Sequence, residues 1–271
     1  MAQEKSRSEK RKRNRKIRNR IAFGLLAIFS IAAVLYSGIQ LMNYYEDHRS
    51  EMELKEELLQ LRSEVDMKSA AEKSDNDAEK EAEKLRAFYR NMKEKNEDYV
   101  CWINLGGADI DYPVVWRDNS FYLNHNFEGE KNRHGSIFLD ENCTPEEEVL
   151  LLHGHHMKDG TMFGGLKKYK DREFCEKNRE IVLCFEEEYA AYRIFAIAQV
   201  DLTAEGSFAF EVLPKTLEEK MLYIEGLNRA SFWYDETVVA NDVERESLLI
   251  LSTCDYGTED ERLLVAAKKI E

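Results

Sequence analysis

The sequence has few cysteines and no two of them in a Cys-x-x-Cys arrangement. The five that occur are odd in number and irregularly spaced: Cys101, Cys143, Cys175, Cys184 and Cys254. An odd, irregular set is not a disulfide framework, and without a Cys-x-x-Cys pair neither a dithiol redox centre nor a zinc module is expected. Cys101 and Cys184 stand inside apolar runs, so we interpret them as core thiols.

Positive charge is scarce outside the first 20 residues. Residues 1–20 hold ten Lys or Arg and two Glu, whereas the rest of the chain holds 29 basic and 51 acidic residues. Because binding to a phosphate backbone requires a basic surface, the acidic body argues against a nucleic-acid partner.

Charge is absent from residues 21–45, and residues 21–42 are mostly Ala, Ile, Leu, Phe and Val. About 20 such residues span a bilayer core, and a basic cluster directly before them keeps the N-terminus in the cytoplasm. A cleaved signal peptide has a shorter apolar region, of about 7–15 residues, with a small-x-small site. We therefore expect a basic cytoplasmic leader over residues 1–20 and a single-pass transmembrane signal anchor over residues 21–42.

Proline and glycine are absent from residues 46–87, which are rich in Glu, Lys, Asp and Ala. Four apolar residues repeat there at coiled-coil spacing: Leu54, Leu58, Leu61 and Val65. Two heptads are fewer than the three to four that predict a coiled coil, so a solvated helical spacer is favoured over a dimerising stalk. We expect a charged helical stalk or linker over residues 43–87, with a break at residues 70–77 and a second helix at residues 78–96.

The remaining residues, 88–271, have the sequence pattern of a folded β domain. Short β-rich runs alternate with turn residues, at 100–104, 109–115, 136–139, 149–153, 180–185, 189–200, 237–239, 248–254 and 263–267. Several short strands at this spacing predict a closed barrel or a sandwich. Residues 215–227 carry apolar side chains at helical spacing and are predicted to form a helix.

One predicted strand ends in a cysteine. The apolar run 247–253 leads to Cys254, and the next run starts with Arg262, after a polar segment that contains Gly257. A strand–loop–strand hairpin would place Cys254 and Arg262 together at one end of a sheet. A cysteine nucleophile also needs a base or a cation that holds it as thiolate.

A candidate base stands at the end of another apolar run, where His153, His155 and His156 follow residues 149–152. A metal site would need further ligands at suitable spacing, and none is evident, so no metal is expected. The other three histidines are interpreted as stalk or surface residues: His48, His125 and His134.

These residues resemble the signature of the sortase family, which is read here as Ile250-Leu251-Ser252-Thr253-Cys254, Arg262 and Gly154-His155. Four longer stretches are similar to class B sortases: residues 110–116, 122–127, 135–140 and 154–163. The resemblance covers about residues 88–271. Two positions depart from it, since Ile250 replaces the usual Thr or Ser, and His153 replaces the usual Tyr before Gly-His.

The scarcity of proline argues against one class of the family. Class C sortases usually carry an Asp-Pro-aromatic lid and a second, C-terminal membrane span. The three prolines here follow Tyr112, Thr144 and Leu213, and the chain ends in Ala-Lys-Lys-Ile-Glu, so class C is not expected.

The resemblance implies a mainly β fold with accessory helices. It is a closed eight-stranded β-barrel of the sortase type, with N-terminal helices and a helix, residues 215–227, in the loop before the penultimate strand. The catalytic domain, residues 88–271, would lie outside the cell membrane.

The resemblance also implies a cysteine transpeptidase without a cofactor. The Cys254 thiolate would attack a Thr carbonyl in the C-terminal sorting signal of a secreted protein, His155 would move the protons, and Arg262 would stabilise the oxyanion or align the peptide. Ser252, Thr253 and His153 would contact substrate. The acceptor would be a peptidoglycan precursor, a cell-wall peptide amine or a pilin lysine. A cysteine peptidase and a non-enzymatic membrane-anchored scaffold remain alternatives.

Overall fold

The computed structural model describes residues 2–63, 65, 75–239, 246–254 and 260–270. The chain divides into two compact units, residues 1–49 and residues 50–271. Two long helices come first, α1 (Ala2–Arg62) and α2 (Asp75–Lys95). The described strands are β1 (Tyr99–Leu105), β2 (Ile110–Trp116), β3 (Ile137–Leu139), β4 (Val149–His153), β5 (Glu180–Cys184), β6 (Tyr189–Asp201), β7 (Ser231–Tyr234), β8 (Leu248–Cys254) and β9 (Glu261–Lys269). The short helices are η1 (Gly106–Ala108), η2 (Phe121–Leu123), η3 (Phe163–Lys170), α3 (Arg172–Lys177), α4 (Leu217–Ala230) and α5 (Glu236–Val239).

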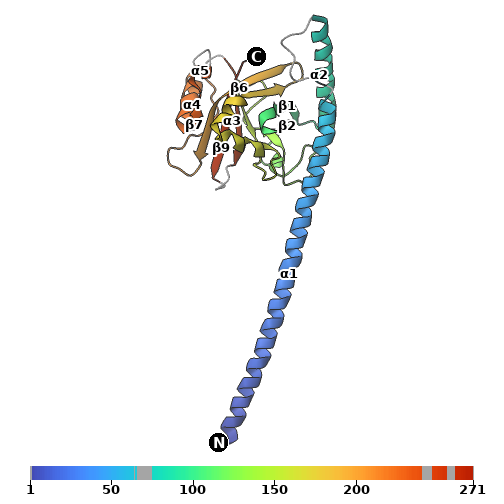
Figure 1. Ribbon diagram of the computed structural model, residues 1–271, viewed down its shortest axis with the longest axis vertical. Coiled ribbons are helices and arrows are strands. Elements are labelled where there is room, and N and C mark those ends of the chain that lie inside the picture. The colour runs from blue at the N-terminus through green and yellow to red at the C-terminus, as the bar shows by residue number, and fades with distance from the viewer. Residues whose placement is uncertain (1, 64, 66–74, 240–245, 255–259, 271) are drawn as a thin grey trace. The chain divides into compact units, whose positions relative to one another are not determined.

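Eight of the strands close into a barrel (Figure 1). The order is β5-β1-β2-β3-β4-β8-β9-β6, and a further pairing of β5 with β6 completes the ring. Strand β6 is 13 residues long, so one of its edges pairs with β5 over residues 189–193 and then with β7 over residues 196–198. The predicted closed eight-stranded barrel is confirmed, with β7 as an additional strand outside the ring.

Strands β4 and β8 run parallel, and they carry the continuous apolar runs Val149–Leu152 and Leu248–Leu251. Every one of these eight side chains is buried. Strands buried on both faces read as unbroken hydrophobic runs rather than as alternating ones. The sequence around the predicted site is therefore apolar up to the point where each strand ends, and the polar residues follow there.

Helix α4 confirms the helix predicted before the penultimate strand. The Thr216 side chain caps it by accepting a hydrogen bond from the Glu219 amide, and the Glu219 carboxylate accepts one from the Thr216 amide. This capping box fixes the start of the helix. Its buried face includes Tyr223, Ile224 and Leu227, which join the barrel core.

One predicted strand is wrong. Residues 237–239 belong to helix α5, because the Asp235 carboxylate accepts hydrogen bonds from the Thr237 amide at 2.9 Å and from its hydroxyl at 2.6 Å. An aspartate that caps backbone amides starts a helix, and this local contact overrides the β preference of Thr237 and the two valines. The strand in this region is β7, which pairs with β6 instead.

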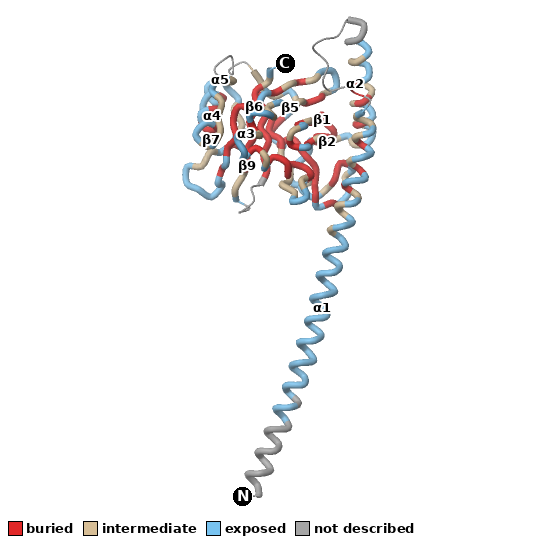
Figure 2. The backbone as a smooth tube through the Cα atoms, in the orientation of Figure 1, coloured by how far each residue is buried: buried red, intermediate tan, exposed pale blue. Residues whose placement is uncertain are grey.

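The end of α1, from residue 50, and helix α2 lie side by side against β1 and β2 (Figure 1). Leu54 and Leu58 are 8% and 2% exposed, and they share a hydrophobic cluster with Leu85, Phe88 and Trp102. Leu54 and Leu58 of the predicted stalk thus pack within the same chain. Figure 2 colours parts of this end of α1 as buried. The compact unit accordingly starts at Ser50. Of the predicted break, residues 70–74 lie outside the described residues, and residues 75–77 belong to α2.

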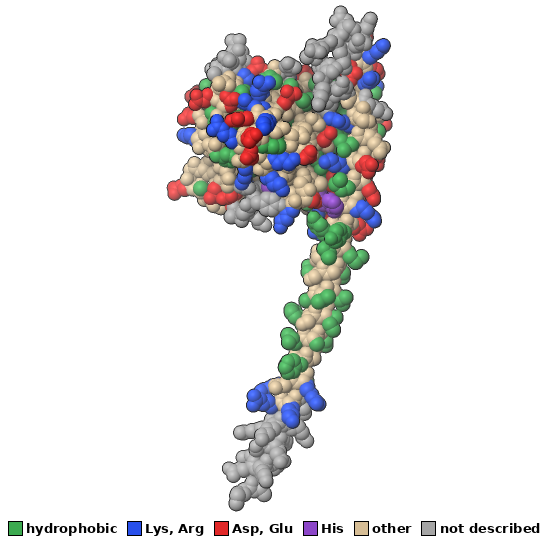
Figure 3. Space-filling model, viewed as in Figure 1, with side chains coloured by type: hydrophobic (Ala, Val, Ile, Leu, Met, Phe, Trp, Pro, Cys, Tyr) green, Lys and Arg blue, Asp and Glu red, His purple; other side chains and the backbone are tan. Residues whose placement is uncertain are grey.

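The first unit is helical, and its apolar stretch is uncovered. Large apolar side chains between Ile21 and Met42 are 56–72% exposed. Figure 3 shows these side chains along the helix, with Lys and Arg side chains at the N-terminal end of the stretch. Among the described residues, one helix is long and apolar enough to cross a membrane.

Candidate active site

The candidate site lies where β4 and β8 end and β9 begins. In the parallel pair His153 is the partner of Ser252, and the Gly154 amide donates to the Ser252 carbonyl at 3.2 Å. In the antiparallel pair Cys254 is the partner of Arg262. The predicted hairpin is confirmed at the level of the strands. Gly257 and the rest of residues 255–259 lie outside the described residues.

His155 lies at the start of a tight loop, residues 154–163, that we name the His155 loop. The Phe163 amide donates to the His155 carbonyl at 3.0 Å, and His156 forms an isolated β-bridge with Met162. A Cβ atom on Gly154 would lie 2.7 Å from the Phe163 ring. Glycine is therefore required directly before His155, because any side chain at position 154 would clash with the Phe163 ring that closes the loop.

The His155 ring is oriented by a backbone carbonyl. Its Nε2 atom lies 2.6 Å from the carbonyl oxygen of Leu123, the last residue of η2. A carbonyl oxygen only accepts hydrogen bonds, so Nε2 carries a proton. Nδ1 is then the nitrogen left to exchange protons with a reactant.

A groove of about 400 Å³ collects the predicted site residues. Its lining includes five of the six: His153, His155, Ser252, Thr253 and Arg262. The sixth, Cys254, directly follows Thr253 in β8, and its side chain lies outside the described part of the chain. Residues from three strands and one loop, separated by about a hundred positions in the sequence, thus meet in one concave surface.

The match to known proteins fits this architecture. The sortase domain family model matches residues 103–270. The chain belongs to the sortase family. It is 30% identical to sortase B of Staphylococcus aureus over 200 residues, which cover 71% of this chain and 78% of that one. It is 29% identical to sortase B of Listeria monocytogenes, over 69% of this chain and 75% of that one.

A solved structure supports the same class. A mutant form of Clostridium perfringens sortase B superposes with a TM-score of 0.68 at 28% identity, and the match covers 79% of this chain and 97% of that one. The curated relatives and this neighbour are all sortase B proteins, so this sortase is of class B, and its activity is that of a cysteine transpeptidase.

In the lining of the groove of this sortase, Asp140 holds His153. The Nε2 atom of His153 lies 2.9 Å from the Asp140 carboxylate, whose side chain is 4% exposed. Burial by itself would raise the pKa of Asp140, but hydrogen bonds from His153, from the Asn142 amide and from the Asn119 and Asn142 side chains outweigh it and lower the pKa to about 2. Position 153, where the class usually has Tyr, therefore carries an imidazole fixed by an anion.

Asp140 and the Leu123 carbonyl are site features that sequence reasoning missed. Asp140 ends the stretch 135–140, which resembles class B sortases, so a signal for it existed. No side-chain pattern could reveal the Leu123 carbonyl, because it is a backbone atom.

Ser252 and Thr253 form the buried floor beside the groove. Each is 2% exposed, and neither hydroxyl has a hydrogen-bond partner among the described residues. Buried hydroxyl groups are usually paired, so two adjacent unpaired ones beside a groove are unusual. Their contact with substrate stays a prediction.

The other four cysteines of this sortase are unsuited to nucleophilic chemistry. Cys101, Cys143, Cys175 and Cys184 are all buried. Burial raises the pKa of Cys101 well above its usual value, that of Cys143 to about 11, and those of Cys175 and Cys184 to about 12. Because the thiolate is the reactive form, these thiols are inert near neutral pH. The prediction that Cys101 and Cys184 are core thiols is confirmed.

Proposed function

We propose that this sortase is a membrane-anchored transpeptidase that acts through a Cys254 thioester. It cleaves a C-terminal sorting signal of secreted proteins at a threonine and joins the acyl group to a cell-wall or pilin amine. The observation that carries the proposal is the ladder that pairs Cys254 with Arg262, in the same groove as His155.

The first step is acylation. The Cys254 thiolate attacks the threonine carbonyl, and the carbonyl oxygen becomes an oxyanion. Residues directly opposite in an antiparallel pair have Cβ atoms about 4.5–5.5 Å apart. This spacing supports Arg262 as the group that stabilises the oxyanion, or that aligns the peptide through its carbonyls.

Proton transfer belongs to His155. It donates a proton to the leaving amine, so that the C–N bond breaks and the thioester remains. The incoming amine then attacks the thioester, His155 takes the proton of that amine, and the Cys254 thiolate leaves. The Leu123 carbonyl holds the Nε2 proton, which supports Nδ1 as the atom that exchanges protons in both steps.

Substrate binding is assigned to Ser252, Thr253 and His153. The first two present buried hydroxyl groups beside the groove that have no hydrogen-bond partner in the described part of the chain. His153 is fixed by Asp140, so it offers a rigid polar edge to a peptide. No step of this reaction requires a cofactor or a metal.

The nucleophile is tested with the full chain in detergent and a panel of fluorogenic sorting peptides, with and without an added amine. Cys254→Ala should abolish cleavage at unchanged melting temperature, because the change removes little buried area. Cys184→Ala is the matched control and should keep turnover. A Cys254→Ala variant with normal turnover would refute the proposal. Cleavage that never transfers to the amine would instead favour a cysteine peptidase.

Anchoring and orientation form a separate part of the proposal. The exposed apolar stretch at residues 21–42 and the basic residues before it support a span with its N-terminus in the cytoplasm. Protease added to intact protoplasts should then digest the catalytic domain. Protection of that domain until the membrane is lysed would contradict this orientation.

A further inference from the structure

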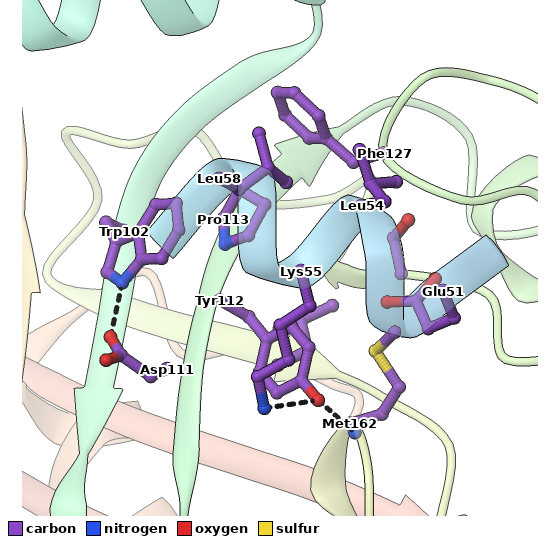
Figure 4. A pocket seen from close by; sticks show the side chains of 12 residues that line it. Glu51, Leu54, Lys55, Leu58, Trp102, Asp111, Tyr112, Pro113, Phe127 and Met162 are labelled. Atoms are coloured by element: carbon purple, nitrogen blue, oxygen red, sulfur yellow. Dashed lines mark hydrogen bonds between the residues drawn. The ribbon is translucent and has the colours of Figure 1, made fainter. Parts of the chain in front are cut away.

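The last turns of helix α1 reach the His155 loop through a tyrosine. Figure 4 shows Lys55 of α1 directed at the hydroxyl group of Tyr112 on β2, with the Met162 amide on the same oxygen. The Lys55 Nζ atom donates at 2.8 Å, and the Met162 amide donates at 3.3 Å. One oxygen atom therefore joins the helix, the barrel and the last part of the loop.

Met162 is the residue whose conformation defines how the loop ends. It has a φ of 50°, a region that non-glycine residues rarely adopt, and it is 2% exposed. Such conformations persist only where the surroundings over-determine them. Met162 bridges His156, and the next residue, Phe163, donates to the His155 carbonyl. The Tyr112 hydroxyl thus supports a strained residue that pairs with His156 and directly precedes the residue that donates to His155.

A second route joins the same helix to the middle of the loop. The Asn132 side chain donates to the Ser50 hydroxyl at 3.2 Å and contacts His134 Nδ1 at 2.9 Å. The Nε2 atom of His134 lies 3.0 Å from the Asp159 carboxylate, which also accepts from the Thr161 amide. Burial tends to raise the pKa of Asp159, but hydrogen bonds from Thr161 and His134 lower it to about 2. His134 is fully buried, so the prediction that it is a stalk or surface residue is wrong.

Polar groups, rather than apolar ones alone, occupy this contact between helix and loop. Glu51 is 4% exposed, and its Oε2 atom has no hydrogen-bond partner among the described residues. Burial raises its pKa to about 8, with Lys55 opposing the shift and Asp159 adding to it. Apolar side chains would fill the same contact without these penalties. A polar contact of this kind is sensitive to position, because each donor must meet its acceptor.

We propose that residues 50–55 of helix α1 position His155 for proton transfer, acting through Tyr112 and the His155 loop. Lys55 and Tyr112 are positioning residues, since the groove lining includes neither of them. The inference rests on the proposed role of His155. One consequence is that a chain cut at residue 88 retains the groove residues but loses the helix that sets the loop.

Tyr112→Phe tests the link in the full chain in detergent, and Tyr169→Phe is the matched control. Tyr169 is also fully buried and donates one hydrogen bond, to the Asn178 carbonyl at 2.6 Å, away from the loop. Four quantities are measured: kcat and KM for a cleaved sorting peptide, the melting temperature, and the imidazole ¹⁵N signals of His155, assigned by their loss in His155→Ala.

Tyr112→Phe should lower kcat about tenfold or more with little change in KM, because small misplacements of a catalytic group lower turnover strongly. The His155 signals should shift in the same variant. Tyr169→Phe should change neither kcat nor the His155 signals. Lys55→Gln should reproduce the effect of Tyr112→Phe, and Lys55→Arg should restore part of kcat, because the guanidinium keeps a donor.

The inference is overturned if both Tyr112→Phe and Lys55→Gln keep the wild-type kcat, or if kcat falls while the His155 signals stay in place. If Tyr112→Phe does not fold, Lys55→Gln decides alone, since Lys55 is only half-buried. Failure of the proposed function is a different result, in which Cys254→Ala or His155→Ala remains active. The ¹⁵N signals report the position of His155 in either case.

Discussion

The groove and the surface where residues 50–63 and 65 of the chain pack on the barrel, which we name the helix interface, each contain a nearly fully buried carboxyl group. The pKa values of the two groups shift in opposite directions. Asp140 beside the groove accepts hydrogen bonds from His153, Asn119 and Asn142, and its pKa falls to about 2. Glu51 on α1 has a buried oxygen atom for which the described residues provide no donor, and its pKa rises to about 8. Burial raises the pKa of both groups, and only at Asp140 do hydrogen-bond donors outweigh it.

The difference separates two kinds of surface. The groove is lined by groups that keep defined charges and defined ring orientations, as a catalytic surface requires. The helix interface is mostly apolar, with Leu54 and Leu58 against Trp102, and it contributes packing. We therefore expect substitutions in the groove to change turnover and substitutions in the helix interface to change stability. The Lys55–Tyr112–Met162 link is the expected exception.

The largest effect on turnover among the groove variants compared here is expected for His155→Ala. General acid–base groups contribute about 10²–10⁴-fold, and no neighbouring side chain can replace the ring at that position. Turnover by His156→Ala and His153→Ala should be reduced less. Steady-state peptide cleavage by the three variants, under one set of conditions, provides the comparison. If His156→Ala were inactive and His155→Ala active, the assignment of the base would be off by one residue.

Arg262→Ala should follow, with a loss of about 10²–10³ in kcat, the usual effect of removing one oxyanion donor. Arg262→Lys should lie between it and wild type, because lysine keeps the charge but loses the planar fork. Both variants should melt at nearly the wild-type temperature. An Arg262→Ala variant as active as wild type would show that the ladder opposite Cys254 has no catalytic meaning.

The helix interface should respond in stability instead. Leu58→Ala removes a side chain that is 2% exposed and should lower the free energy of unfolding by about 2–5 kcal/mol. Met52→Ala, on the same helix but 42% exposed, is the matched control and should have little effect. Denaturant unfolding of the full chain measures both. Equal effects would mean that Leu58 does not pack on the barrel in solution.

The two carboxyl groups should give opposite and smaller effects of pH on stability. The pKa of Asp140 is lowered on folding, so its contribution of about 2 kcal/mol is present above pH ~4 and is lost as the pH falls towards 2. The pKa of Glu51 is raised, so stability should decline as the pH rises from 4.5 to about 8.

Melting temperatures of Asp140→Asn and Glu51→Gln across this range separate the two groups. Asp140→Asn should be less stable than wild type at neutral pH and should approach it in acid. Glu51→Gln should gain on wild type as the pH rises. If the difference in melting temperature from wild type changed with pH in the same direction for both variants, the contrast between the two carboxyl groups would be wrong.

The sequence predicts the groove better than the helix interface, for a physical reason. Cys254 and Arg262 are joined by a short hairpin, so local alternation and turn chemistry predict their pairing. The continuous apolar run before His155 likewise places that residue at the end of a strand. These patterns are local, and the barrel implied by the resemblance brings them together.

The helix interface depends on what lies far away in the chain. The spacing of Leu54 and Leu58 predicts an apolar helix face, but it does not specify whether another copy, solvent or the barrel covers that face. The electrostatic effect of Asp159, in the His155 loop, on Glu51 is equally non-local. The single wrong strand, residues 237–239, has a local cause, because the cap from Asp235 outweighs the β preference of the residues that follow.

The most direct test of the account is the covalent state of Cys254 during turnover. The full chain in detergent is mixed with a cleaved sorting peptide, quenched in acid, and mapped by peptide mass spectrometry. An acyl adduct that ends in threonine is expected on the peptide containing Cys254, and an added amine should take up the acyl group with loss of the adduct. Turnover of the peptide without any adduct on Cys254, or with the adduct on another cysteine, would contradict it.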